Sequence, residues 1–182
     1  MSYSACFNTA SINLGCAASA GGLKEIYVVA GSITGTPATT IDGSISGLTG
    51  TGDIYTFELQ KQTSNMVETF QISLENGTTY FEQAVTAVFN KMDQEKRNQL
   101  KLLSRNRQIV LFARDNNDTF WYLGSDFSGG FLSAGTGETG TAFGDRNGYS
   151  VTITTYSTEP ANTLYTPNNE LSDVVSGLTI NS

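Results

Sequence analysis

Hydrophobic and polar residues alternate along several stretches of this chain, and a period of two predicts β-strands. The clearest stretch is 79–90, where one face carries Phe81, Val85, Ala87 and Phe89, with Gln83 as the polar exception. The same alternation predicts strands over 53–61, 67–74 and 149–155. Their expected inward residues are Tyr55, Phe57, Leu59, Phe70, Ile72, Leu74, Tyr149, Val151 and Ile153. The Asn-Gly pair within 75–78 predicts a tight turn between strands 67–74 and 79–90.

Three further strands are predicted at 23–30, 108–114 and 119–123. Residues 108–114 are mostly apolar at consecutive positions, which is typical of a strand covered on both faces. Residues 119–123 are rich in aromatic side chains and follow a polar turn at 115–118. The aromatic residues of these two strands are interpreted as core, because the strands are too apolar to face water; an exposed set beside a basic helix would instead suit nucleic acid.

One helix is predicted at about 93–105, between two of the long strands. Asp93 is a suitable N-cap, and Glu95 places negative charge in the first turn. Leu100 and Leu103 are three positions apart and can be buried together. Lys96, Arg97, Lys101 and Arg105 are then expected to stay in water.

These elements predict a mainly β fold, an antiparallel β-sandwich or barrel of about six or seven strands with one flanking helix. Two Gly-rich stretches, 34–53 and 125–147, are expected to be long loops, the first with a short strand over 39–45. The division expected is an N-terminal arm over 1–22, a domain over 23–158 and an extended, polar C-terminal arm over 159–182. The longest apolar runs have five residues, so no membrane anchor is expected, and residues 1–22 lack the features of a signal peptide.

The charge is unevenly distributed along the chain. The net charge is −7, but the segment 91–114 holds seven of the ten basic residues and only two acidic ones, which gives it +5. A solvated helix face is one interpretation of this basic band. The other is that the band contacts an acidic surface on a second copy of the chain.

No motif in the sequence predicts catalysis, a cofactor or a metal ion. Histidine is absent, which removes the commonest general base and zinc ligand. Cys6 and Cys16 fit no zinc spacing, and whether they pair is left open. The glycines at 135, 137 and 140 match a dinucleotide-binding spacing but open no helix, and the acidic turn at 115–118 lacks the pattern of a calcium loop. The chain is therefore expected not to be an enzyme.

One string of residues carries a resemblance to a known family. The succession ENGTTYFEQAVTAVFNKMDQEKRNQLKLLSRNRQIVLFARDNNDTFWYLG, followed by a glycine-rich stretch and GDRNGYSVTIT, resembles virion structural proteins of tailed phages of Bacteroidetes-type bacteria. The order of elements over 23–158 is similar to that of the tail tube family. The resemblance implies a subunit of rings, usually hexameric, that stack into a tube for DNA ejection. It also implies assembly in the host cytoplasm, location in the virion tail and contacts with other tail proteins.

The resemblance gives candidate residues for these roles. Residues expected to face the channel lie on polar faces of the 67–74 and 79–90 strands: Gln71, Ser73, Glu82 and Thr86, with Glu68 as a further candidate. The residues expected at the subunit interface are Lys96, Arg97, Lys101 and Arg105, and the arms are expected to become ordered on a neighbouring ring. DNA would pass the acidic channel without sequence-specific binding.

Two alternatives stay open at this stage. One is another virion part, such as a head-to-tail connector, a tail terminator or a capsid decoration protein. The other is a β-sandwich module that binds glycans, for which Phe127 and Phe131 are the candidate aromatic contacts. The sequence leaves ring symmetry and the presence of a contractile sheath undetermined.

Overall fold

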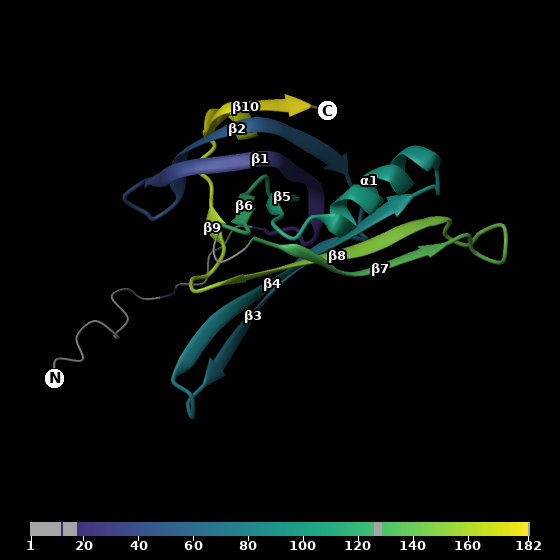
Figure 1. The fold of residues 1–182 in the computed structure, drawn as a ribbon, viewed down its shortest axis with the longest axis horizontal. Coiled ribbons are helices and arrows are strands. Elements are labelled where there is room, and N and C mark those ends of the chain that lie inside the picture. Colours follow the sequence, from purple (N-terminus) through teal and green to yellow (C-terminus); the bar gives the residue numbers. More distant parts are fainter. Residues whose placement is uncertain (1–11, 13–17, 126–128, 182) are drawn as a thin grey trace.

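The computed structural model describes residues 12, 18–125 and 129–181, and it is mainly β with one α-helix (Figure 1). The expected fold class is confirmed. The described strands are β1 (Leu23–Thr39), β2 (Ile45–Glu58), β3 (Asn65–Ser73), β4 (Thr78–Asn90), β5 (Val110–Asp115), β6 (Phe120–Leu123), β7 (Phe131–Glu138), β8 (Gly148–Ser157), β9 (Asn162–Thr163) and β10 (Val175–Asn181). The helix α1 is Gln94–Arg105, and a short 3-10 helix, η2, spans Leu171–Asp173.

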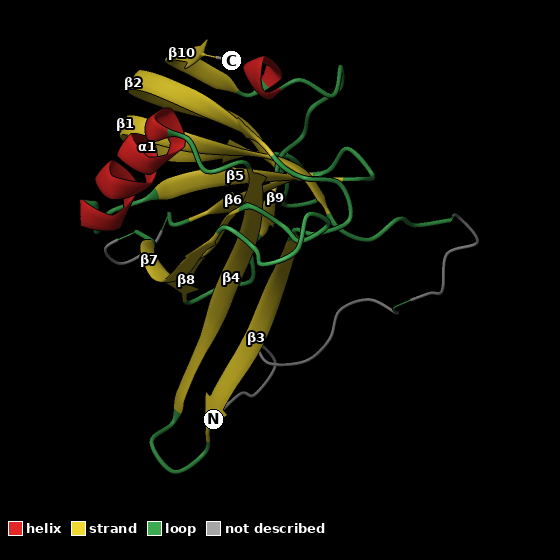
Figure 2. Cartoon of the chain, turned by 90° about the vertical axis from the view of Figure 1, so that its right-hand side faces the viewer, coloured by secondary structure: helices red, strands yellow, loops and turns green. Residues whose placement is uncertain are grey.

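The strands form two sheets. One has six strands in the order β10-β2-β1-β5-β6-β9, and the other has four in the order β3-β4-β8-β7. Every strand pair is antiparallel except β10 with β2, which is parallel. Figure 2 shows the four-stranded sheet beneath the curled six-stranded one, with α1 beside them.

A hydrophobic core fills the space between the two sheets. Ile26 and Leu111 from the six-stranded sheet are in one buried cluster with Val85 and Ile153 from the four-stranded sheet. Leu103 adds the helix to the same cluster, and Leu100 packs against it. The predicted helix is therefore confirmed, with Leu103 buried and Leu100 partly buried beside it.

Both faces of the six-stranded sheet are buried, and the C-terminal segment covers the second face. Tyr27, Phe112 and Phe120 alternate along their strands with residues of the first cluster and point to the opposite side. There they form a second cluster with apolar residues of the C-terminal segment, which are Leu164, Leu171, Val174 and Val175. Figure 1 shows this segment running back along the sheet to β10.

This placement differs from the polar arm expected over 159–182. The few apolar residues of that segment are spaced too irregularly for a strand or helix pattern, so the sequence indicates no partner for them. The structure places β9 beside β6 and β10 beside β2, within the same chain. The arm is thus ordered by its own domain without a neighbouring ring. The N-terminal arm over 1–22 is also expected to become ordered on a neighbouring ring, and most of its residues lie outside the described part of the chain.

The two Gly-rich stretches also differ from the long loops expected. Residues 34–53 are mostly the two arms of the β1–β2 hairpin, and the supposed strand over 39–45 contains its turn, where the Thr40 N–H donates to the Ser44 carbonyl at 2.8 Å. Residues 125–147 contain β7. The glycines permit close pairing: a Cβ on Gly31 would lie 2.1 Å from the Thr51 carbonyl oxygen. A glycine-rich composition, which predicted loops at these two stretches, therefore occurs here in strands whose backbones approach closely.

The expected inward faces hold only in part. Phe57 packs against the first core cluster, but Tyr55 is 46% exposed, whereas its neighbour Ile54 is fully buried in the second cluster. A period of two identifies one buried face, and it fails where a sheet is covered on both sides.

The covering role of the C-terminal segment can be tested by truncating a side chain. Leu171 is 3% exposed, so Leu171→Ala is expected to lower the free energy of unfolding by about 2–5 kcal/mol through lost burial and a new cavity. Ile180, in the same segment but 38% exposed, provides the matched control, Ile180→Ala, with a smaller loss. Urea denaturation measures both. Equal losses for the two variants would show that the segment does not seal the sheet.

Candidate assembly surfaces

The four residues expected to line a channel lie on one face of the four-stranded sheet. Paired residues of neighbouring strands lie on one face of a sheet, and so do alternate residues of one strand. In the register of β3 and β4, Gln71 and Ser73 of β3 therefore point to the same side as Glu82 and Thr86 of β4. This side is opposite to the buried Val85 and Ala87, and all four residues are half-buried. The structure brings these residues together and leaves the role in a channel as a hypothesis.

This outer face carries no cationic residue from any of its strands. β3, β4, β7 and β8 contain no lysine or arginine, and their only ionisable acids are Glu68, Glu82 and Glu138. The uncharged polar groups are partly bonded to one another, as in the contact of 3.3 Å between the Thr86 and Thr152 hydroxyls. Such a surface offers nothing to hold a phosphate backbone electrostatically.

Glu68 is on the other face of the sheet, so it does not share a surface with the other four candidates. It pairs with Gln83 in the register of β3 and β4. Its Oε1 accepts hydrogen bonds from Gln83 Nε2 at 3.0 Å and from the Ala161 N–H at 2.7 Å, while Thr155 donates to Gln83 Oε1 at 2.9 Å. This network explains why a glutamine occupies the core face of β4: the amide links the hairpin to β8, and Glu68 links it to the C-terminal segment.

The β3–β4 hairpin extends beyond the body of the protein, as Figures 1 and 2 show. β8 pairs with β4 only as far as Phe81, so the outer part of the hairpin has two strands. On it, Phe70 is 61%, Ile72 66% and Leu74 94% exposed. They continue the core-facing side of β3, and Phe70 contacts Phe81 at 5.1 Å between ring centroids. The sequence predicted their common face correctly but gave no sign that the covering layer ends before them.

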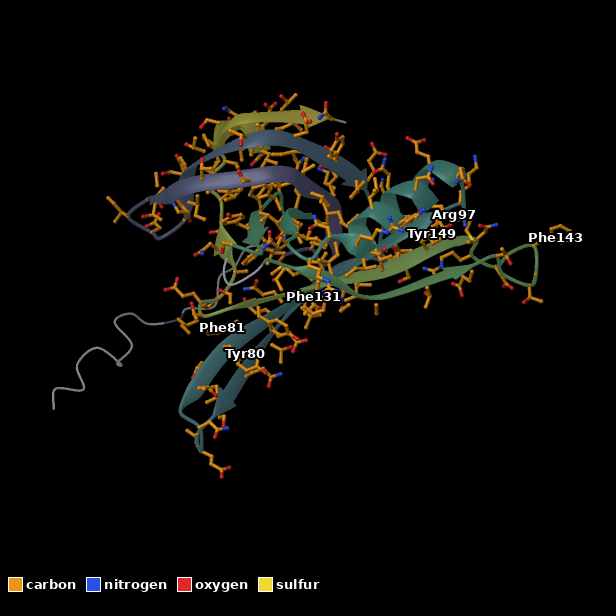
Figure 3. All side chains as sticks on the ribbon, in the orientation of Figure 1. Tyr80, Phe81, Arg97, Phe131, Phe143 and Tyr149 are labelled. Carbon is orange, nitrogen blue, oxygen red and sulfur yellow. The ribbon has the colours of Figure 1, made fainter. Side chains whose placement is uncertain are left out.

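Three aromatic side chains form a row across the outer face. Tyr156 lies 6.0 Å from Tyr80 and 6.2 Å from Phe131 between ring centroids, and each is roughly two-fifths exposed. Figure 3 shows Tyr80 and Phe131 on this sheet. The ring planes are inclined by 70° and 36°, so they form no flat platform of the kind that stacks on sugars. The other glycan candidate, Phe127, lies outside the described residues.

Of the four basic residues of α1, Lys96 contacts the N-cap residue Asp93 and the other three are exposed. Lys96 Nζ lies 2.7 Å from Asp93 Oδ2, while the Lys96 N–H donates to Asp93 Oδ1 at 2.8 Å. Arg97, Lys101 and Arg105 are exposed, lie four residues apart, and form none of the salt bridges found in the described part of the chain. The exposed residues of α1 therefore include these three cations, and Leu102 is 61% exposed. The other exposed residues are uncharged except Glu95 in the first turn: Gln94, Asn98, Gln99 and Ser104.

Arg114, at the end of the same basic segment, is a structural residue. Its guanidinium bonds Glu25 at 3.3 Å and Asp118 at 2.7 Å, and it lies over the Phe120 ring. Tyr27 donates to Glu25 at 2.6 Å, and burial together with this carboxylate raises the pKa of Tyr27 to about 12. The cluster fixes β1 to β5 and the following turn.

A groove of about 650 Å³ lies between α1 and the end of β2. Phe57, Phe89 and Leu100 form its apolar lining, whereas Glu58, Asp93 and Glu95 contribute carboxylates. No set of three or more metal-ligating side chains is found among the described residues, and none of their helices is long and apolar enough to span a membrane. The groove combines no nucleophile with a positioned base, so its geometry indicates no reaction.

Two motifs singled out in the sequence have structural roles. The glycines at 135 and 137 lie in β7, and Gly140 follows in the turn to β8. Asp115 Oδ1 accepts from the Asn117 and Thr119 N–H groups, at 2.8 and 2.9 Å, as a hairpin-turn aspartate does. Cys6 and Cys16 are outside the described residues.

The cap of α1 makes a pH-dependent prediction. The hydrogen bond from the Lys96 side chain, together with that from its backbone N–H, holds the pKa of Asp93 below its ordinary value of 3.8. A lowered folded-state pKa stabilises the protein above the unfolded-state value, and this contribution is lost as pH falls through the folded-state value. Asp93→Ala should therefore lower the Tm near pH 7, and the difference from the wild type should shrink below about pH 4.

Thermal denaturation followed by circular dichroism measures this difference. Glu95→Ala is the control, because it removes a carboxylate of the first turn and keeps the Asp93 cap. Its Tm should differ from that of the wild type by less than the Tm of Asp93→Ala does near pH 7. A Tm difference for Asp93→Ala that is constant from pH 7 to pH 3 would contradict the assignment.

Comparison with protein-family models and with curated protein sequences finds no match for this chain.

Proposed function

We propose that this protein is a virion structural subunit that assembles into stacked rings and forms the tail tube of a tailed phage. The resemblance of residues 23–158 to tail tube proteins suggests this role. The observation that carries it is the four-stranded sheet, which combines two unpaired edges with an outer face whose strands contain no lysine or arginine.

The sheet edges suit lateral assembly. β3 and β7 are the terminal strands of the four-stranded sheet, and neither pairs with a further strand among the described residues. Long exposed edges are normally blocked by lysine, proline or a covering segment, because their free N–H and C=O groups can pair with another chain. β3 and β7 contain neither lysine nor proline. Pairing of β3 in one copy with β7 in the next is a heterologous contact, and such contacts close into rings when the rotation permits.

The outer face of the sheet suits a channel for DNA. In a ring built through these edges, the polar face bearing Gln71, Ser73, Glu82 and Thr86 lines the lumen. Its strands contribute Glu82 and Glu138 and no lysine or arginine, and Arg146 of the β7–β8 turn is bonded to Glu138. The phosphates of passing DNA therefore meet no unpaired cation from these strands. The function is mechanical, and the described side chains are used for packing and assembly.

Electron microscopy of the purified protein in negative stain tests the proposal directly. Stacked rings or tubes of indefinite length are the expected result. A single ring would instead favour a connector or tail terminator, and isolated trimers would favour a decoration protein. The proposal would be overturned if the purified protein stays monomeric at high concentration and if, in purified virions, it is found only on the exterior of the capsid.

The basic helix face supplies a second prediction. Reversing Arg97, Lys101 and Arg105 to Glu should leave folding intact, because all three side chains are exposed, but should impair assembly at physiological salt. The control reverses Lys61, Lys91 and Arg107, which are also exposed, and so changes the net charge equally. Circular dichroism and sedimentation velocity give the two readouts. Equal assembly of both variants would mean that the helix face is only solvated surface.

The channel assignment predicts a gain of DNA retention. Gln71→Lys combined with Thr86→Lys places two cations per subunit on the outer face of the sheet, so assembled tubes should retain double-stranded DNA at low salt and release it as salt rises. Co-sedimentation of labelled short DNA with the tubes measures this. Retention equal to that of wild-type tubes would place these residues away from the lumen.

A further inference from the structure

The outer half of the β3–β4 hairpin is an apolar and acidic surface that its own chain does not cover. Phe70, Ile72 and Leu74 are exposed on one side of it, and Glu75 follows at the turn. Residues 65–90 contain three acidic residues and no basic residue. Glu68 is bonded on the core face and Glu82 lies on the opposite face, so Glu75 is the acidic residue of the outer half. A two-stranded hairpin is marginally stable in water by itself, and further covering of its apolar side would stabilise it.

The exposed face of α1 has the complementary properties. The helix contains four basic residues and one acidic residue, which gives it +3. Arg97, Lys101 and Arg105 follow one another along its exposed side, and the exposed Leu102 borders this row next to Arg105. Each of the two surfaces thus pairs apolar area with charge of one sign, and the signs are opposite.

We propose that the β3–β4 hairpin of one copy docks on the exposed face of α1 in a second copy. Leu74 and Ile72 would cover Leu102, and Glu75 would lie among the three cations. Burial of the apolar side chains supplies affinity, while the charges select orientation and suppress hairpin-to-hairpin pairing. The inference rests on the proposed function, because it identifies the partner surface of the helix face used in assembly.

The contact must form between copies. In both views the hairpin points away from α1, and they lie on different sides of the molecule (Figures 1 and 2). A contact between two different surfaces of identical chains is heterologous, so each docked copy still offers a free hairpin and a free helix face. The contact can therefore continue from subunit to subunit, as extended assembly requires.

Charge reversal with rescue tests the electrostatic part. Glu75→Arg should raise the concentration needed for assembly about two- to fivefold, the effect of one exposed ion pair. The helix variant carries Arg97→Glu and Lys101→Glu. Adding Glu75→Arg to this helix variant should restore part of the assembly that the helix variant loses. Asp42→Arg, at the exposed β1–β2 turn, is the control and should not rescue the helix variant. Absence of rescue by Glu75→Arg would overturn the charge pairing.

Disulfide trapping tests the contact itself. In a chain carrying Cys6→Ser and Cys16→Ser, one sample carries Leu74→Cys and a second carries Asn98→Cys, on the exposed side of α1. Mixing and mild oxidation should give a heterodimer joined through these two positions. Ile41→Cys, equally exposed at the β1–β2 turn, replaces Leu74→Cys in the control and should give little product.

The outcomes separate this inference from the proposed function. Trapping by Leu74→Cys but not by Ile41→Cys supports the docking. Tubes or rings without trapping would overturn the docking while leaving the proposed function intact. Predominant trapping of Leu74→Cys with itself would replace the docking by a two-fold hairpin contact. A protein that neither assembles nor is trapped would overturn both.

Discussion

Burial of both faces of the six-stranded sheet is the constraint on which this structure depends. One face packs on the four-stranded sheet and α1, and the other is covered by the C-terminal segment. Phe112 and Phe120 are fully buried on the second face, so without that cover two large aromatic rings would face water. Because rings of this size bury roughly 150–250 Å² each, the cover is a substantial part of the core.

The four-stranded sheet has the opposite character, since one of its faces stays open. Its core side supplies Val85 and Ile153 to the packed interior. Its outer side carries polar residues and a row of aromatic rings, receives no lysine or arginine from its strands and continues into the hairpin. Both sheets contribute to the core, and the open face of the four-stranded sheet is the one proposed for assembly. The contacts of Gln83 and Glu68 join the hairpin to β8 and to the C-terminal segment where the hairpin leaves the body.

The separation of charge follows the same division. Of the seven cations of the segment 91–114, Lys96 and Arg114 are fixed in structural contacts, and Arg97, Lys101 and Arg105 are exposed on α1. Lys91 and Arg107 are exposed just outside the helix. The hairpin carries acidic residues alone. Within one copy these regions point away from each other, so their attraction is available between copies.

The sequence by itself determined the elements that depend on local chemistry. Asp93 marked the helix start because an N-cap needs an oxygen within reach of the first free N–H groups, and alternation placed β4 with one polar exception, Gln83. Pairing registers then followed the predicted faces, so the grouping of Gln71, Ser73, Glu82 and Thr86 was predictable from a period of two.

Only the tertiary structure decided which predicted faces are covered. The alternation that buries Val85 also exposes Leu74, because the local pattern is the same and the covering layer ends between them. The tertiary structure likewise placed Leu171 and Val174 on the six-stranded sheet, and it brought the Ala161 N–H to Glu68. It also bonded Lys96 to Asp93, apart from the other cations of the helix. Burial depends on neighbours distant in the chain, and a periodic pattern carries no information about where those neighbours stop.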